Sequence, residues 1–149
     1  MDVKTAFLNG DLKEDVYMFQ PEGFSVKGKE QTVCKLVKSL YGLKQAPRAW
    51  YEKLTEHLLK LNYKHFNLDD ATLFVKKVGR SIVYLVVYVD DLLITRNNDD
   101  YVVFIKKELQ KVFDMMDLGL LHYYLGIESR SEAIIHIYFS KEVYWESIE

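Results

Sequence analysis

A pair of aspartates, Asp90 and Asp91, lies inside an almost wholly apolar run formed by residues 82–95. The run is rich in β-branched and aromatic residues, which predicts two buried strands with the acidic pair at the tight turn between them. Adjacent like charges beside a low-dielectric sheet repel, and each carboxylate resists ionising unless a cation compensates. This placement indicates a divalent metal site, although the pair taken alone also fits a solvated hairpin turn.

Two other Asp-Asp pairs serve as a comparison. Residues 69–70 follow a polar connection, and residues 99–100 open a helical pattern in which acidic side chains favour the helix dipole. Neither pair needs a metal. The apolar surroundings therefore distinguish Asp90 and Asp91 from the other acidic pairs.

Several segments around the pair carry a family resemblance. Residues 88–91 (YVDD) resemble the signature tetrapeptide of reverse transcriptases, and residues 2–10 (DVKTAFLNG) resemble the segment that carries their other catalytic aspartate. Residues 39–50 (SLYGLKQAPRAW) are similar to the template-and-nucleotide-contacting block of copia-type (Ty1/copia) retrotransposon polymerases. Residues 20–24 and 123–128 add further copia-type matches. The resemblance covers nearly the whole chain.

The resemblance implies that Asp2, Asp90 and Asp91 are the catalytic residues and the ligands of two Mg²⁺ (or Mn²⁺) ions. Such ions lie about 3.5–4 Å apart; one activates the primer 3′-hydroxyl and the other holds the triphosphate. Carboxylate oxygens suit these hard cations. Asp2 and Asp90 are 88 positions apart, so the site requires a fold that brings the first strand beside the acidic hairpin.

The implied substrates are an RNA template, a DNA primer and deoxynucleoside triphosphates. Phe7 stands where the family places an aromatic ring under the incoming sugar, which implies selection against ribonucleotides; the alternative is that Phe7 packs in the core. Further residues implied in nucleotide binding are Tyr41, Gly42 and Lys44, although a lone loop lysine is commonly only solvated. The implied template and primer contacts are Gln45, Pro47, Tyr88, Val89, Leu125 and Gly126. Residues 123–128 resemble a primer-gripping hairpin and also fit an ordinary sheet edge.

Charge is distributed unevenly along the chain. The net charge is −2, yet residues 25–64 hold nine Lys or Arg against three Glu. A basic segment beside an acidic cluster suits an enzyme that holds phosphate backbones near metal ions. The alternative is a solvated, lysine-rich helix face.

The periodicity predicts an α+β fold. Expected strands cover residues 16–19, 32–37, 72–78, 81–89 and 92–95, expected helices begin at Pro47 and cover 99–113, and a late hairpin joins 122–129 to 134–139 before a short helix after Ser140. Helices segregated onto one face of a mainly antiparallel sheet match the polymerase palm that the resemblance implies.

Length and composition bound the organisation. With 149 residues, 49% of them hydrophobic, the chain suits one core. We expect a single partial reverse transcriptase domain over residues 1–149, without fingers, full thumb, ribonuclease H or integrase. The single cysteine excludes an internal disulfide, and no membrane span or signal peptide is expected. The expected location is intracellular, cytoplasmic (in a virus-like particle) or nuclear, and the oligomeric state stays open.

The predicted function is RNA-directed DNA synthesis for a copia-type retrotransposon. The chain alone is expected to be inactive, because the fingers are absent and because Asp2, which follows only Met1, should fray as terminal residues do. One alternative is a catalytically inactive palm remnant or nucleic-acid-binding interaction module. Another is a metal-dependent nuclease, which is disfavoured because Phe7 and the 39–50 block have no role in simple hydrolysis.

Overall fold

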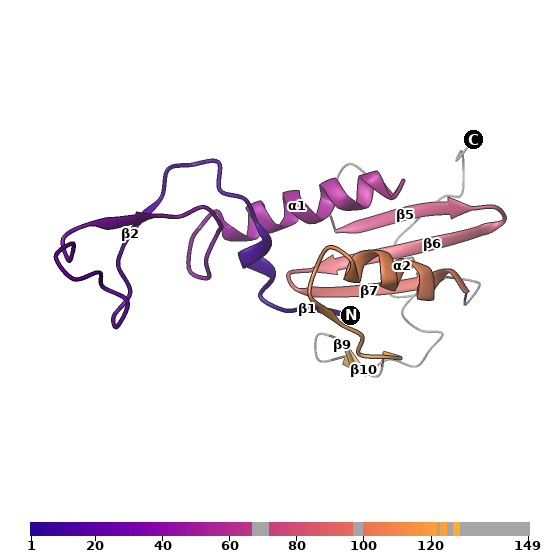
Figure 1. The fold of residues 1–149 in the computed structure, drawn as a ribbon. Helices are drawn as coiled ribbons and strands as arrows, with labels where there is room; N and C mark the ends of the chain where they lie inside the picture. The colour runs from indigo at the N-terminus through magenta and orange to yellow at the C-terminus, as the bar shows by residue number, and fades with distance from the viewer. Residues whose placement is uncertain (67–71, 97–99, 122, 125–126, 129–149) are drawn as a thin grey trace.

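The main element of the protein is a six-stranded antiparallel sheet (Figure 1). The computed structural model describes residues 1–66, 72–96, 100–121, 123–124 and 127–128. The strands follow the spatial order β4-β5-β6-β7-β1-β8. Their bounds are β1 (Asp2–Val3), β4 (Lys64–His65), β5 (Leu73–Val78), β6 (Ser81–Tyr88), β7 (Asp91–Arg96) and β8 (Met115–Met116). The antiparallel sheet and its helices confirm the predicted α+β class.

Two helices, α1 (Ala46–Lys60) and α2 (Asp100–Gln110), cover one face of this sheet. Pro47 lies in the first turn of α1, where its missing N–H costs no helical hydrogen bond. Alternate residues of a strand face the same side of a sheet. The main core joins such residues of β6 to both helices, through Val83, Leu85 and Val87 on the strand, Trp50, Leu54 and Leu58 on α1, and Ile105 and Leu109 on α2. The prediction that the helices share one face is confirmed.

The second helix is shorter than predicted. It ends at Gln110, and the chain then turns, with the Val112 amide donating to the Leu109 carbonyl. Phe113 is nevertheless buried in the main core. The apolar periodicity therefore continues past the last helical residue because the turn returns Phe113 to the same core.

The other face of the sheet carries a smaller apolar cluster and is called the open face below. It consists of Leu73, Tyr84, Val86 and Leu93, with partly buried neighbours that include Leu121. No helix contributes to either set. Within the described residues, no helix combines the length and the apolar character that crossing a membrane requires.

A separate hairpin pairs β2 (Tyr17–Phe19) with β3 (Val33–Lys35) and projects away from the main sheet (Figure 1). These strands confirm the two predicted near residues 16–19 and 32–37, although both are shorter. The Gln20 side chain closes the long connection by donating to the Lys29 carbonyl and accepting from the Val26 amide. The hairpin is therefore ordered by its own polar contacts.

The late hairpin differs from the prediction. Strand β9 (Tyr123–Tyr124) pairs with β10 (Ile127–Glu128), so both strands lie within the segment that the sequence analysis treats as one. The predicted partner strand at 134–139 and the helix after Ser140 lie outside the described residues.

The first strand lies inside the sheet. Met1 and Leu92 exchange two backbone hydrogen bonds of 2.8 Å, and Val3 pairs with Met115 on the other side. The expectation that Asp2 frays is wrong in this structure, because β7 and β8 hold β1 from both sides.

Candidate active site

Asp2 and Asp91 lie directly opposite each other on β1 and β7. The neighbouring residues Met1 and Leu92 form a hydrogen-bonded pair, so Asp2 and Asp91 form the intervening non-hydrogen-bonded pair, in which side chains approach most closely. Their Cβ atoms are therefore roughly 4.5–5.5 Å apart. Val3 and Leu92 are buried on the helix side, which directs the two aspartates to the open face.

Asp90 lies in the two-residue turn between β6 and β7, next to Val89. Its backbone carbonyl accepts a 2.9 Å hydrogen bond from the Val3 amide, which ties the turn to β1. Val89 has a φ of 55°, in the left-handed region. Such a conformation is unusual for a β-branched residue and costs about 1–3 kcal/mol. The turn that carries Asp90 is thus strained and is held by its surroundings.

The electrostatics of Asp91 reflect this crowding. Partial burial, followed by the negative charges of Asp90 and Asp2, raises the pKa of the Asp91 carboxyl group above its ordinary value, and the nearby N-terminal ammonium group opposes the rise. A carboxyl group with a raised pKa resists carrying its charge. A cation bound among the three aspartates would relieve both the desolvation and the repulsion.

The three aspartates carry the oxygen donors that a magnesium ion prefers. In the described part of the chain, no group of three or more His, Cys, Asp or Glu side chains is arranged as a ready-made metal cage. Mg²⁺ commonly binds through one or two carboxylates together with substrate phosphates and water, without an all-protein cage. The opposed pair Asp2 and Asp91, with Asp90 in the adjoining turn, would suit such open coordination by its chemistry.

Phe7 lies in the short 3₁₀ helix η1 (Ala6–Asn9), which follows β1. Its half-buried ring packs against the main core on one side and contacts the Tyr41 ring, with centroids 4.6 Å apart. The fully buried Ser39 hydroxyl donates to the Phe7 carbonyl. Gly10 fixes η1 against α1, because a Cβ there would lie 2.8 Å from the carbonyl carbon of Ala49. Phe7 thus combines core packing with partial exposure beside Tyr41.

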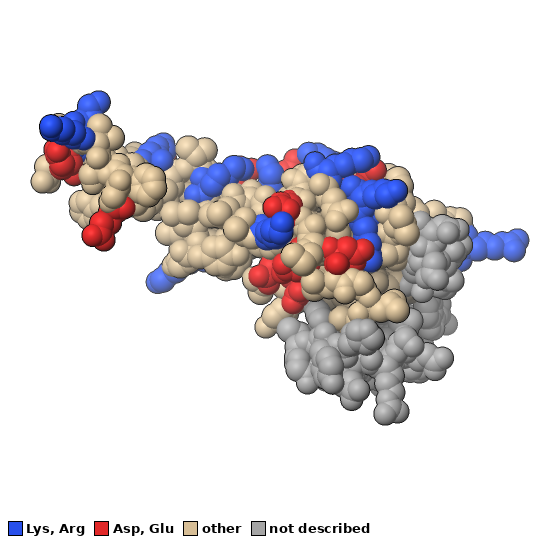
Figure 2. Space-filling view, turned by 60° about the horizontal axis from the view of Figure 1, so that its bottom comes forward, with Lys and Arg blue, Asp and Glu red and all other residues tan. Residues whose placement is uncertain are grey.

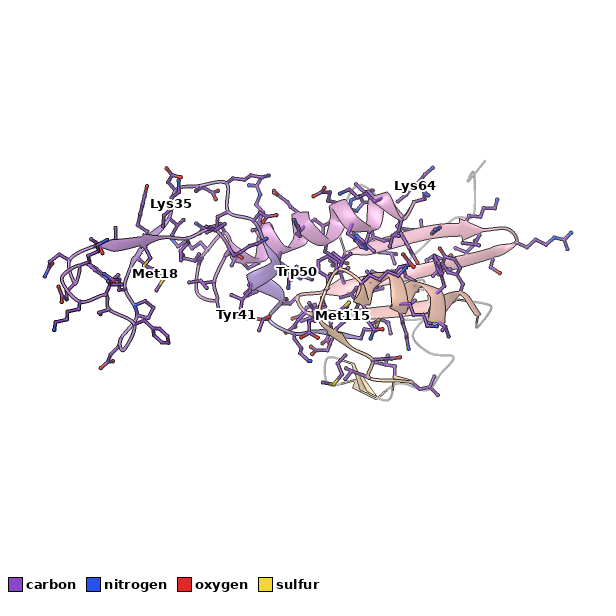
Figure 3. All side chains as sticks on the ribbon, in the orientation of Figure 1. Met18, Lys35, Tyr41, Trp50, Lys64 and Met115 are labelled. Atoms are coloured by element: carbon purple, nitrogen blue, oxygen red, sulfur yellow. The ribbon has the colours of Figure 1, made fainter. Side chains whose placement is uncertain are left out.

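The remaining predicted contacts surround this region. Tyr41 is 55% exposed and lies beside η1 (Figure 3), and Gly42 adopts a φ of 93° in the following turn. Lys44 is exposed, Gln45 occupies the N-cap of α1, and Pro47 is exposed in the first helical turn. Tyr88 and Val89 are about half exposed at the end of β6 and in its turn. Leu125 and Gly126 lie outside the described residues.

The basic segment of the sequence is partly neutralised by acids that precede it. Lys38 and Lys53 both bind Asp11, and their hydrogen bonds lower the pKa of that carboxyl group to about 2. Lys35 binds Asp15 in the same way. Figure 2 shows acidic side chains near the middle of the face that looks forward and basic side chains mostly above them. The local excess of positive charge is therefore smaller in space than in sequence.

One contact at the site escaped sequence reasoning. The indole N–H of Trp50 on α1 donates a 2.6 Å hydrogen bond to the Val89 carbonyl. The helical spacing of apolar residues assigns Trp50 to the core, which is correct, since its side chain is 2% exposed. No sequence pattern indicates which acceptor a buried indole reaches.

Comparison with known proteins identifies the family. The family described as reverse transcriptase (RNA-dependent DNA polymerase) matches residues 1–148. The chain belongs to this reverse transcriptase family. No solved structure gives a significant match.

Similar curated proteins place this reverse transcriptase chain among retrotransposon polyproteins of the Ty1/copia type. It is 49% identical over 130 residues to the Retrovirus-related Pol polyprotein from transposon RE1 of Arabidopsis thaliana, with 87% of this chain and 9% of that protein covered. It is 44% identical over 149 residues to the corresponding polyprotein from transposon TNT 1-94 of Nicotiana tabacum, with 99% and 11% covered. The Transposon Ty1-BR Gag-Pol polyprotein of Saccharomyces cerevisiae is 27% identical over 135 residues, with 86% and 7% covered. The chain thus spans about a tenth of the length of the two plant relatives.

Proposed function

We propose that this chain is the palm of a copia-type RNA-directed DNA polymerase, which adds deoxynucleotides to a DNA primer paired with an RNA template. The observation that carries the proposal is the Asp2–Asp91 pair beside the turn that holds Asp90. Like charges placed opposite each other on a sheet are destabilising, so a purely structural role gives no reason for them. The names of the relatives favour action within a Pol polyprotein, and the proposed location is the cytoplasm or the nucleus.

The proposed ligands of two Mg²⁺ or Mn²⁺ ions are Asp2, Asp90 and Asp91. When bound, such ions activate the attacking 3′-hydroxyl and stabilise charge on the leaving pyrophosphate. The chain contributes fixed positions: β1 and β7 hold two carboxylates in register, and the strained turn holds the third. Because phosphoryl transfer depends mainly on positioning and charge stabilisation, this rigidity is the main catalytic contribution of the protein.

The proposed substrate contacts follow from the surroundings of the aspartates. The half-buried ring of Phe7 contacts Tyr41, and its backbone carbonyl accepts from Ser39; this ring would lie under the incoming sugar and collide with a ribose 2′-hydroxyl. Val89 and Tyr88 extend from the turn toward the primer. Gln45 and Pro47, at the start of α1, would line the pocket for the template base, with Gly42 and Lys44 beside the nucleotide.

The test is a chimera in which this chain replaces the matching segment of the tobacco relative. Extension of a primer on an RNA template with Mg²⁺ or Mn²⁺ is measured with labelled deoxynucleotides. The Asp90→Asn chimera should lose activity by several orders of magnitude, whereas Asp15→Asn, in the separate hairpin region and paired with Lys35, should retain it.

Three results separate the alternatives. An inactive chimera beside an active parent polyprotein would contradict the polymerase proposal. Nucleic-acid binding that ignores Mg²⁺ would favour an inactive palm that serves as a binding module. Cleavage of the nucleic acid without extension, lost in Asp90→Asn, would favour a nuclease.

A further inference from the structure

The side chain of Trp50 connects helix α1 to the acidic turn. Its indole N–H reaches the Val89 carbonyl at 2.6 Å, across 39 positions of sequence. Figure 3 shows Trp50 between α1 and the end of the β6–β7 hairpin. A side chain of helix α1 is thus bonded directly to the backbone of that turn.

Trp50 itself has little freedom to move. Its ring packs edge-on against Phe113, with centroids 5.1 Å apart and planes at 85°. The backbone of Trp50 is also closely packed. A Cβ added to Gly10 would lie 2.8 Å from the backbone nitrogen of Trp50, which shows how closely η1 approaches α1 at this residue. The indole donor is therefore fixed in space by packing that does not involve the turn.

The acceptor belongs to the strained residue. Val89 has a φ of 55°, and a β-branched residue persists in that conformation only where its surroundings hold it there. Asp90 and Asp91 follow immediately, and the Asp90 carbonyl in turn accepts from the Val3 amide. A change at Val89 would thus be transmitted to all three strands that meet at the aspartates.

We propose that Trp50 is a positioning residue, whose indole N–H holds Val89 in the left-handed conformation and thereby fixes where Asp90 and Asp91 lie. The effect on metal binding rests on the proposed function, whereas the effect on the turn does not. A buried indole N–H needs an acceptor wherever it lies; here the acceptor is the carbonyl of the strained residue Val89, so satisfying the indole also restrains the turn.

Amide hydrogen exchange on the 149-residue chain tests the turn-holding role. Trp50→Phe keeps an aromatic ring but removes the N–H, and losing this hydrogen bond should speed exchange of the Val3 amide about tenfold. The Phe66 amide, which donates to Leu73 at 2.9 Å between β4 and β5, is the internal reference and should not change. Tyr63→Phe is the matched control variant, because it too removes a buried aromatic donor from the core, and within the described residues that hydroxyl has no hydrogen-bond partner.

A second substitution separates holding from packing. Glycine adopts positive φ at no steric cost, so in a Val89→Gly background the additional effect of Trp50→Phe should fall below about twofold. Equal acceleration in both backgrounds, or no acceleration at all, would overturn the proposal and return Trp50 to core packing.

Titration of the same variants with Mn²⁺ measures the consequence for the aspartates. Groups that orient metal ligands typically change metal affinity by roughly tenfold or more, so Trp50→Phe should weaken Mn²⁺ binding about tenfold, Asp90→Asn more, and Tyr63→Phe not at all. If the unmodified chain binds no Mn²⁺, the proposed metal site fails, while the exchange result still decides the role of Trp50.

Discussion

Replacing Asp91 with asparagine should stabilise the metal-free protein. Asp91 faces Asp2 across the β1–β7 ladder and follows Asp90 in sequence. Two like charges about 5 Å apart repel by about 1 kcal/mol in a water-like dielectric and about 3 kcal/mol at an effective dielectric of 20. The measured interaction energies of cross-strand pairs lie at the low end of this range. For the partly exposed Asp91, we expect a gain of about 1 kcal/mol in the free energy of unfolding, or about 2–4 °C in Tm.

The pH dependence of this gain has a definite sign. The pKa of Asp91 is raised in the folded protein, so its proton binds more tightly to the folded than to the unfolded chain. The associated stability is fully present below the ordinary pKa of 3.8 and is lost as the pH rises through the raised folded pKa. The advantage of Asp91→Asn over the unmodified chain should therefore be largest near neutral pH and should shrink as the pH falls toward about 4.

A bound divalent metal ion should reverse the order of stability of the unmodified chain and Asp91→Asn. A ligand at about ten times its Kd stabilises the folded state by roughly 1.4 kcal/mol, and the unmodified chain should gain this from Mn²⁺ while Asp91→Asn should not. The assay is urea denaturation followed by circular dichroism, with and without Mn²⁺. The control, Asp114→Asn, breaks an exposed ion pair with Lys4 and should cost less than about 1 kcal/mol. A metal-free Asp91→Asn chain that is less stable at pH 7, with Mn²⁺ making no difference, would refute the reasoning.

Four further outcomes are expected. Gly10→Ala should destabilise the chain by about 1–3 kcal/mol in urea denaturation, because the added Cβ overlaps the backbone of α1; a loss below about 0.5 kcal/mol would show that η1 and α1 separate easily. Phe7→Ala, in the active chimera, should improve ribonucleotide use relative to deoxynucleotide use, and unchanged discrimination would leave Phe7 as a core residue. Asp11→Ala should cost less than about 1 kcal/mol at pH 7, since its carboxylate is half exposed, and distinctly less at pH 2, which is about the lowered pKa of that carboxyl group and where roughly half of it is protonated; an equal cost at both pH values would exclude a charge effect. The 149-residue chain alone should not extend a primer, and labelled product that disappears in Asp90→Asn would contradict this.

Local patterns predicted the parts of the fold that depend on neighbouring residues. The apolar run at residues 82–95 forms β6 and β7 around a two-residue turn. This could be predicted because the spacing of apolar residues and the residues that favour a turn are both apparent within a few positions of sequence. The helical spacing after Pro47 likewise becomes α1. Strands β4 and β8 were not predicted, because two residues are too few to show any period.

In the candidate site, Asp90 and Asp91 were indicated by their apolar surroundings and the other residues by family resemblance alone, and neither indicated the geometry. Nothing near Asp2 indicates that its register partner is Asp91 or that both face the open side of the sheet, because long-range pairing is settled by tertiary packing. The same holds for the contacts of Phe7 with Tyr41 and of Trp50 with Val89. Each of these contacts joins segments that are more than thirty positions apart.

The position of β1 between β7 and β8 also sets the timing of assembly during translation. Strand β1 is synthesised before both of its neighbours. It can pair with β7 only after residues 91–96 have been synthesised, and with β8 only after residues 115–116. At about 5–20 residues per second, the 112 positions between Val3 and Met115 take roughly 6–22 s to produce. Until β8 has been synthesised, the edge of β1 that will receive it is unpaired, and an unpaired strand edge can recruit another chain. Asp2 and Asp91 can therefore come together only once β7 has been synthesised, and until β8 follows, aggregation at the unpaired edge of β1 competes with closure of the sheet.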